Sequence, residues 1–121
     1  MKLGILGNGM IVRDLMNTIH RLKLEKIYIM GREASREKIE QLVSGNHLTG
    51  SFYHYEELLK TDVDVIYVAL PNHLHYEYAR KALEYKKHVI IEKPAVSGAK
   101  ELQELAELAG KLNRMLFEAM N

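Results

Sequence analysis

The chain has no cysteine among its 121 residues, which excludes disulfides, thiolate catalysis and cysteine-ligated metal sites. It also has no excess of charge, because 17 basic and 16 acidic side chains leave a formal net charge of +1. A chain so close to neutral lacks the field that holds a nucleic acid, so we expect no nucleic-acid partner. No apolar run approaches the roughly 20 residues of a membrane span, so we expect no membrane partner either.

The sequence does contain enough apolar residues for a core, since 47% of them are hydrophobic. That fraction suits one packed domain of this length. The opening stretch, MKLGILGNGM, carries one lysine and several apolar side chains, but glycines interrupt it and no small-residue cleavage site follows. We therefore expect a single cytoplasmic domain over residues 1–121 without a secretory signal.

Short apolar runs alternate with longer amphipathic stretches along the chain. Runs rich in β-branched and aliphatic residues predict buried strands over residues 2–6, 26–30, 63–70, 88–92 and 114–119. Apolar side chains at helical spacing predict helices over residues 10–21, 33–43, 74–85 and 97–112. Residues 50–60 are less clear and could hold a short strand followed by one or two helical turns.

Strands that alternate with helices of this length pair in parallel through right-handed crossovers. The pattern therefore predicts an α/β fold with a doubly wound parallel sheet in three α/β/α layers. Such sheets bind ligands at the carboxyl ends of their strands, near the point where the strand order reverses. We expect the functional residues directly after each strand.

A G-x-G motif of Gly7, Asn8 and Gly9 joins the first predicted strand to the first predicted helix. In dinucleotide-binding folds the first glycine makes the tight turn and the second lets a pyrophosphate approach the backbone. The amides that open the helix, here those of Met10 and Ile11, meet the charge of the pyrophosphate. A merely tight turn is the alternative, and the position at a strand-to-helix junction favours the functional interpretation.

The second predicted strand runs into MGREASRE, where the fingerprint places an acidic residue for the adenosine ribose. Gly31 and Arg32 stand there instead. The missing carboxylate removes repulsion of a 2′-phosphate, and Arg32 offers a planar cationic fork, with Ser35 and Arg36 near enough in the chain to assist. These residues favour NADP over NAD. In the alternative, both arginines are solvated side chains of an exposed helix and Glu33 still reaches the ribose.

The strand predicted over residues 63–70 is followed by PNHLH. Asn72 is placed to cap the next helix, and Asn72 and His75, three residues apart, share a face of its first turn. We expect both to face the cofactor crevice, although His75 has the alternative of an ordinary polar residue at a helix start. His73 and His75 lack nearby acids or cysteines, so they make a poor ligand set and we expect no metal.

The strand predicted over residues 88–92 ends in Glu92, Lys93 and Pro94. The proline ends sheet pairing and restricts Lys93 to extended geometry near the crevice. Lys93 could then donate or accept a proton at a substrate oxygen while hydride moves, helped if desolvation and an oxidised nicotinamide lower its pKa. The alternative is a solvated lysine that pairs with Glu92.

Three segments resemble the N-terminal domain of the glucose-fructose oxidoreductase and inositol dehydrogenase family, also called Gfo/Idh/MocA. They are GILGNGMI, DVDVIYVALPNHLHYEYARKALEYKKHVIIEKP and AELAGKLNRMLFEAMN, and the resemblance as a whole extends over essentially the entire chain. The resemblance implies a Rossmann dinucleotide-binding fold. It also implies an NAD(P)-dependent oxidoreductase that moves hydride between the cofactor and a hydroxyl or carbonyl carbon of a sugar, polyol or related small molecule.

The resemblance also implies roles for individual residues. Lys93 is similar to the lysine of the family's E-K-P motif, which assists proton transfer and substrate positioning. The implied cofactor contacts are Gly7, Gly9 and Met10 at the pyrophosphate, Leu70, Asn72 and His75 at its middle, and Glu92 at the nicotinamide end. Val12 departs from the small third residue of the glycine motif, so this helix is expected slightly farther from the strand. Gly31 and Arg32 depart from the common acidic residue and put NAD in doubt as first choice.

Family members continue past EAMN into a second α/β domain, which supplies most substrate and dimer contacts. We therefore expect this chain to be the cofactor-binding domain alone, which binds NADP or NAD and turns over little or nothing. The resemblance implies that the full-length protein is a homo-oligomer acting on a small-molecule substrate. Two alternatives stay open: a non-catalytic dinucleotide-binding or redox-sensing module, and a structural domain that has kept the sheet without the ligand.

Overall fold

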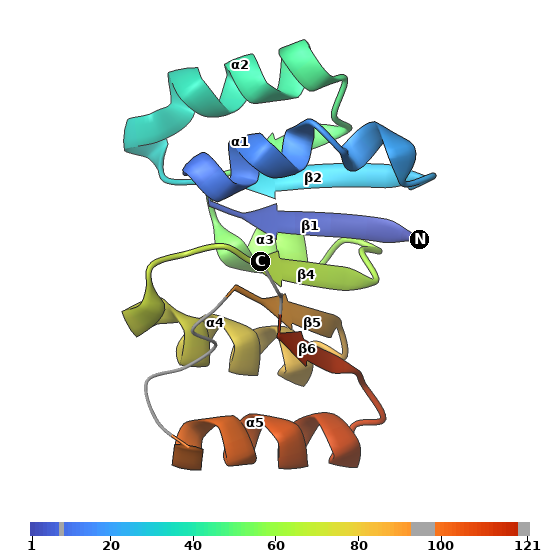
Figure 1. The fold of residues 1–121 in the computed structure, drawn as a ribbon, viewed down its shortest axis with the longest axis vertical. Helices are drawn as coiled ribbons and strands as arrows, with labels where there is room; N and C mark the ends of the chain where they lie inside the picture. The colour runs from blue at the N-terminus through green and yellow to red at the C-terminus, as the bar shows by residue number, and fades with distance from the viewer. Residues whose placement is uncertain (8, 93–98, 119–121) are drawn as a thin grey trace.

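The computed structural model describes residues 1–7, 9–92 and 99–118 (Figure 1). Its strands are β1 (Lys2–Leu6), β2 (Lys26–Met30), β3 (Gly50–Phe52), β4 (Val65–Val68), β5 (His88–Ile91) and β6 (Leu116–Glu118). Its helices are α1 (Met10–Met16), α2 (Arg36–Asn46), α3 (Tyr55–Leu59), α4 (Asn72–Glu84) and α5 (Ala99–Lys111), with 3₁₀ turns η1 (Ile19–Arg21) and η2 (Glu33–Ser35). The predicted alternation is confirmed, and residues 50–60 hold β3 and α3.

All of these strands pair in parallel, in the order β3-β2-β1-β4-β5-β6. From β1 the chain builds outward to β3, then crosses over and builds outward from β4 to β6. The reversal falls between β1 and β4, where Leu6 lies opposite Val68. This order confirms the doubly wound sheet. The edge where the strands end is called the carboxyl edge below, and the opposite edge is called the amino edge.

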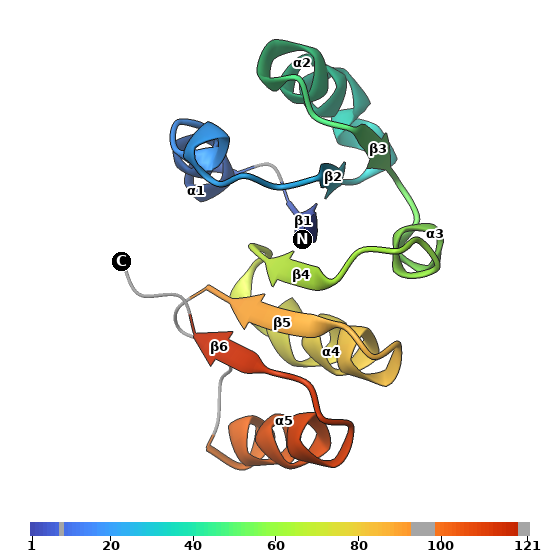
Figure 2. The ribbon, with the colours of Figure 1, turned by 90° about the vertical axis from the view of Figure 1, so that its right-hand side faces the viewer.

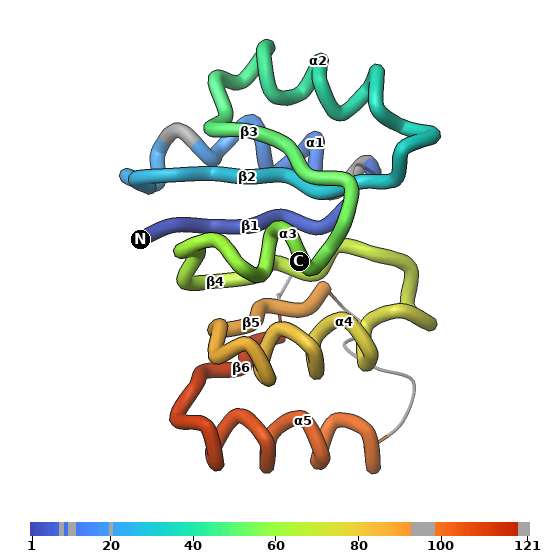
Figure 3. Tube along the Cα trace, turned by 180° about the vertical axis from the view of Figure 1, so that it is seen from behind, coloured from blue at the N-terminus to red at the C-terminus, as the bar shows by residue number. Residues whose placement is uncertain are grey.

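Helices cover both faces of the sheet, which confirms the three layers (Figures 2 and 3). On one face, the buried apolar residues of α1, η1 and α2 pack against β1 and β2; they include Val12, Met16, Ile19 and Ile39 with Leu3, Ile5 and Ile29. On the other face, α3, α4 and α5 pack against β1, β4 and β5; their core includes Leu58, Ala79, Leu83 and Leu105 with Leu6, Ile66, Val68 and Ile91. Alternate residues of each strand enter the two cores, as a sheet buried on both sides requires.

One predicted helix is divided. A helix was expected over residues 10–21, but α1 ends at Met16 and η1 follows as a separate turn. Between them the Thr18 Oγ1 donates a hydrogen bond to the Leu15 carbonyl at 3.1 Å. Such a side-chain bond competes with the helical ladder and favours a break. Within the described ranges no helix is long and apolar enough to cross a membrane.

Candidate cofactor site

A cavity of about 580 Å³ opens at the carboxyl edge, beside the ends of β1, β2 and β4. Four residues predicted from the sequence line it: Gly7, Gly9, Arg32 and Leu70. Sequence reasoning missed the apolar side of the cavity, which is formed by residues such as Ala69, Leu74 and Tyr78. The spacing of Leu74 and Tyr78, one helical turn apart in α4, was the available signal. The cavity lies at the reversal of the strand order, where doubly wound sheets bind ligands.

Gly7 makes the turn out of β1. Its φ is +110°, and a Cβ placed there would lie 2.5 Å from the carbonyl oxygen of Ala69. Its amide donates to the Met30 carbonyl at 2.9 Å, so the turn is tied to the end of β2 as well. Any side chain at this position would both strain the backbone and collide with the loop after β4.

Gly9 differs from Gly7 in that the fold does not require a glycine there. Its φ is −76°, and an added Cβ would meet nothing within 4 Å. Gly9 is exposed at the cavity and precedes α1 without a side-chain cap hydrogen bond. The open space in front of its backbone fits a phosphate group that approaches closely. Asn8 lies outside the described residues, as do the side chains of Met10 and Ile11.

Gly31 begins the loop after β2 and is buried against α2. An added Cβ would lie 2.6 Å from Cδ1 and 2.9 Å from Cγ1 of Ile39, which is itself fully buried. A carboxylate side chain therefore cannot enter at this position unless Ile39 moves. The next residue, Arg32, is exposed and lines the cavity and also a neighbouring one of about 720 Å³, which extends toward α3.

Glu33 and Arg36 bind each other. The Arg36 guanidinium donates two hydrogen bonds to the Glu33 carboxylate, at 3.0 and 2.8 Å, and lies 4.0 Å from the centre of the Tyr53 ring. The hydrogen bond from Arg36 lowers the pKa of Glu33. Both partners of this ion pair are exposed, so it contributes little stability. It does, however, engage both oxygens of the carboxylate that had been considered as an alternative ribose acceptor.

Asn72 and His75, which were both expected to face the cofactor crevice, have different surroundings in the structure. Asn72 is exposed and is the first residue of α4, so the prediction that it caps this helix is wrong: Pro71 holds the cap position, without a side-chain hydrogen bond. The extended geometry of Pro71 suits a residue at a helix start. His75 is 1% exposed, and its Nε2 lies 2.6 Å from the Leu70 carbonyl oxygen. His73, rather than His75, lines the cavity.

Metal-ligating side chains do not gather in the described part of the chain, where no group of three or more His, Cys, Asp or Glu residues is placed to hold an ion.

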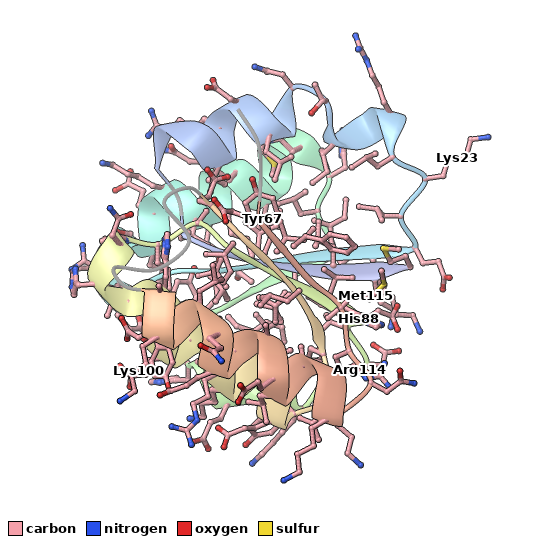
Figure 4. The ribbon with its side chains drawn as sticks, turned by 60° about the horizontal axis from the view of Figure 1, so that its bottom comes forward. Lys23, Tyr67, His88, Lys100, Arg114 and Met115 are labelled. Carbon is pink, nitrogen blue, oxygen red and sulfur yellow. The ribbon has the colours of Figure 1, made fainter. Side chains whose placement is uncertain are left out.

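The end of β5 carries a buried carboxylate. Glu92 is 4% exposed, and its backbone amide donates to the Val68 carbonyl at 3.1 Å. The Tyr67 hydroxyl of β4 donates a hydrogen bond to Glu92 Oε1 (Figure 4 labels Tyr67). Burial, followed by this hydrogen bond, raises the pKa of Tyr67 well above its ordinary value. Lys93, the predicted catalytic residue, lies outside the described residues.

A doubly wound parallel sheet with a glycine turn at its reversal point is the architecture of a nucleotide-binding α/β domain. A model of the oxidoreductase family with an NAD-binding Rossmann fold, GFO_IDH_MocA, matches residues 1–120. The chain therefore belongs to the Gfo/Idh/MocA oxidoreductase family, and it is that family's NAD-binding Rossmann domain.

Two curated relatives and one solved structure illustrate the similarity. Trans-1,2-dihydrobenzene-1,2-diol dehydrogenase of Xenopus tropicalis is 31% identical over 122 residues, which cover 98% of this chain and 36% of that protein. The scyllo-inositol 2-dehydrogenase (NADP(+)) IolU of Bacillus subtilis (strain 168) is 33% identical over 87 residues, covering 71% and 26%. KijD10, a 3-ketoreductase from Actinomadura kijaniata solved with NADP and TDP-benzene, superposes with a TM-score of 0.88 at 26% identity, covering 98% and 36%. The chain thus spans about a third of the length of such relatives.

Proposed function

We propose that this chain is the cofactor-binding part of an NADP-preferring oxidoreductase. The complete enzyme would transfer hydride between the nicotinamide cofactor and a hydroxyl or carbonyl carbon of a sugar, polyol or related small molecule. The observation that carries the proposal is the cavity at the reversal of strand order, which is bordered by Gly7, Gly9 and Gly31 and extends to Arg32. Relatives named as an inositol dehydrogenase with NADP(+) and as a 3-ketoreductase support the reaction class.

The glycine loop would hold the pyrophosphate. Gly7 keeps the turn tight against Ala69, and the space in front of Gly9 admits the phosphates to the backbone. Family resemblance assigns Leu70, Asn72 and His75 to the middle of the cofactor. Because His75 is buried against the Leu70 carbonyl, its contribution would be to shape this loop rather than to reach the ligand directly.

The NADP preference is supported by two properties of the loop after β2. Gly31 leaves no room for the carboxylate that would repel a 2′-phosphate, and Arg32 presents a guanidinium beside the cavity. The Glu33 carboxylate is held by Arg36, which removes the nearest competing acid. Arg32 would therefore be the residue that recognises the 2′-phosphate.

Lys93 would manage the proton of the reaction. The bound nicotinamide supplies hydride transfer, and Lys93 would hold or release a proton at the substrate oxygen as hydride moves. The substrate itself would be held mainly by a part of the protein outside this chain, and the complete protein would be a cytoplasmic homo-oligomer. In that protein, Lys93→Ala would abolish turnover; normal turnover would instead favour a non-catalytic, dinucleotide-sensing module.

A calorimetric titration of the chain with NADPH and with NADH tests the cofactor assignment. We expect tighter binding of NADPH, which Arg32→Ala weakens about 10- to 100-fold, because a hydrogen bond to a charged group contributes about 1.5–3 kcal/mol. NADH binding should be unchanged in this variant. Arg21→Ala, an exposed arginine of η1 that lines neither cavity, is the matched control.

Equal affinities for NADPH and NADH, unaffected by Arg32→Ala, would overturn the NADP preference while leaving the family intact. A folded chain that binds neither cofactor would contradict the cofactor-binding function and favour a structural domain.

A further inference from the structure

The loops that follow β2 and β3 leave the sheet next to each other. Met30 pairs with Phe52 in the parallel register of these strands, and the Gly31 amide donates to the Phe52 carbonyl at 3.2 Å. Arg32 and His54 each stand two residues beyond that pair. Because neighbouring strands lie about 4.8 Å apart, the register brings Arg32 and His54 to adjoining places at the carboxyl edge.

Arg32 and His54 also line the same cavity, the one of about 720 Å³ that extends toward α3. The other charged side chains of its lining are Lys60, Lys81, Glu56 and Glu57. With a neutral imidazole the lining therefore carries three cations and two carboxylates, and protonation of His54 adds a further positive charge. An anionic group beside Arg32 meets an excess of positive charge that grows as the pH falls.

The imidazole of His54 is not used to hold the fold together. His54 is exposed and occupies the cap position before α3, but its side chain makes no cap hydrogen bond and forms none with any residue of the described ranges. The hydrogen bond from Arg36 lowers the pKa of Glu33, and a positive charge on His54 lowers it further, so the imidazole lies within electrostatic reach of the loop after β2. Since Arg36 already binds both oxygens of Glu33, the imidazole is available to a ligand.

The 2′-phosphate of NADP is an anion with room for more than one partner. It has three terminal oxygens, and a guanidinium fork binds two of them. An imidazole changes its charge between pH 5 and 8, and in its protonated form both ring nitrogens are donors. NAD has a hydroxyl in place of this phosphate and offers no anion there. A histidine beside Arg32 therefore meets a target in one cofactor and not in the other.

We propose that His54 is a further specificity-determining residue, whose protonated imidazole donates a hydrogen bond to the 2′-phosphate held by Arg32. This inference rests on the proposed function. It makes the choice between NADP and NAD depend on pH: His54 strengthens NADP binding at pH 6, and this advantage fades toward pH 8. A phosphate monoester itself takes up a proton near about pH 6, so the contribution of His54 is the difference between chains with and without it.

The other titratable side chains around His54 belong to classes that ordinarily keep one charge state between pH 6 and 8. They come from η2, α2, the loop after β3, α3 and α4 and are Glu33, Arg36, Tyr53, Tyr55, Glu56, Glu57, Lys60, Tyr78 and Lys81. His73 lines the cavity at Gly7. It is present in every chain compared below, so its titration cancels in the comparison.

Calorimetric titrations with NADP⁺ and NAD⁺ at pH 6, 7 and 8 would compare the wild-type chain with His54→Asn and His54→Lys. The oxidised cofactors are used because the reduced ones decompose in acid. His47→Asn is the matched control, since His47 is also exposed, follows α2 and lines neither cavity. Asparagine suits both places, because it is a preferred cap at a helix start and tolerates the φ of +54° at His47.

At pH 6, His54→Asn should bind NADP⁺ about three- to tenfold more weakly than the wild type, and at pH 8 the two should agree within about twofold. His54→Lys keeps its charge throughout, so it should bind NADP⁺ about three- to tenfold more tightly than the wild type at pH 8. NAD⁺ should bind all four chains within about twofold at each pH. His47→Asn should follow the wild type with both cofactors.

Unchanged NADP⁺ affinity in His54→Asn at pH 6 would overturn the inference. A loss that is equal at pH 6 and pH 8, or equal for the two cofactors, would also overturn it, because a structural role does not depend on the charge of the imidazole. If His54→Asn does not fold, His54→Lys decides, and no gain in NADP⁺ affinity at pH 8 then overturns the inference. A wild-type chain that binds neither cofactor would instead overturn the proposed function, and the inference with it.

Discussion

The two edges of the sheet differ in how far their polar side chains are paired within the protein. At the amino edge, Asp62 binds the Lys2 ammonium at 2.7 Å and approaches that of Lys26 at 3.8 Å, while Asp64 accepts the backbone amide of Lys2 at 2.8 Å. At the carboxyl edge a cavity lies beside the ends of β1, β2 and β4, and the buried Glu92 carboxylate keeps an oxygen without a described partner. The amino edge pairs its charged groups with one another, whereas the carboxyl edge leaves an acceptor oxygen without a described partner and space for a ligand.

The amino edge also has one buried polar side-chain atom without a described partner, in Arg114. It lies just before β6, near the amino edge, and its Nη1 is 3.2 Å from His88 Nε2 (Figure 4). Its Nε is buried and has no hydrogen-bond partner within the described part of the chain. Arg114 does not line any of the cavities that the described residues form at the carboxyl edge or between α4 and α5, so a buried polar atom without a partner is not by itself evidence of a ligand site. The carboxyl edge is distinguished by incomplete pairing together with a cavity and a glycine, Gly7, that the backbone geometry requires.

The largest effect that we predict is from Gly7→Ala, which tests whether the carboxyl edge depends on its backbone. The positive φ and the collision with the Ala69 carbonyl should together lower the free energy of unfolding by about 3 kcal/mol. NADPH binding should be lost as well. Urea unfolding followed by circular dichroism measures the stability.

Gly110→Ala in α5 is the control for Gly7→Ala, because an added Cβ there meets nothing within 4 Å. It should raise the free energy of unfolding by about 0.5–1 kcal/mol. If Gly7→Ala proves as stable as the wild type, the glycine turn is not the constraint described here.

Gly31→Ala should have a smaller effect, about 1–3 kcal/mol of destabilisation, because its Cβ would press on Ile39. Ile39→Val removes Cδ1, the atom nearest to that Cβ. A double-mutant cycle in urea should therefore show that Gly31→Ala costs less in the Ile39→Val background. If the effects of the two changes on the free energy of unfolding are strictly additive, Ile39 does not exclude a side chain from position 31. This is the place where the NAD-binding fingerprint has an acidic residue.

The smallest predicted effect is at the amino edge, from Asp62→Asn. The hydrogen bond from Lys2 lowers the pKa of Asp62, so its contribution to stability is present above the ordinary value of 3.8 and is lost as the pH falls through the lower folded-state pKa. At pH 7 the variant should unfold at a slightly lower temperature, and less so in high salt. Below that pH window the difference should vanish, and NADPH affinity should not change at pH 7. A large loss of NADPH binding would contradict the division between the two edges.

Much of the backbone architecture could be predicted because the spacing of apolar residues, and the glycines and prolines that end helices and strands, are local properties of the sequence. The strand and helix alternation, the parallel sheet and the turn at Gly7 all follow from short stretches of sequence. The helix break at Thr18 was missed because it depends on a side-chain hydrogen bond that competes with the helical ones. The cap at Pro71 was missed because the first residue of a helix can be predicted from sequence only to within one or two positions.

The side-chain partners across the sheet were not predictable. The Tyr67–Glu92 hydrogen bond depends on the register between β4 and β5, which no local pattern specifies. The contact of Gly31 with Ile39 depends on how α2 packs, and the burial of His75 depends on its reach back to the Leu70 carbonyl. Sequence spacing placed these residues near the site but could not say which of them face the cavity.

The most direct test of the central claim, that the carboxyl edge binds a dinucleotide, is an NMR titration of the ¹⁵N-labelled chain with NADPH. We predict that the amide signals of Gly7, Gly31 and Glu92 shift, while those of Lys2 and Asp64 at the amino edge do not. Shifts confined to the amino edge, or none at Gly7 and Gly31 in a folded chain at saturating NADPH, would contradict it.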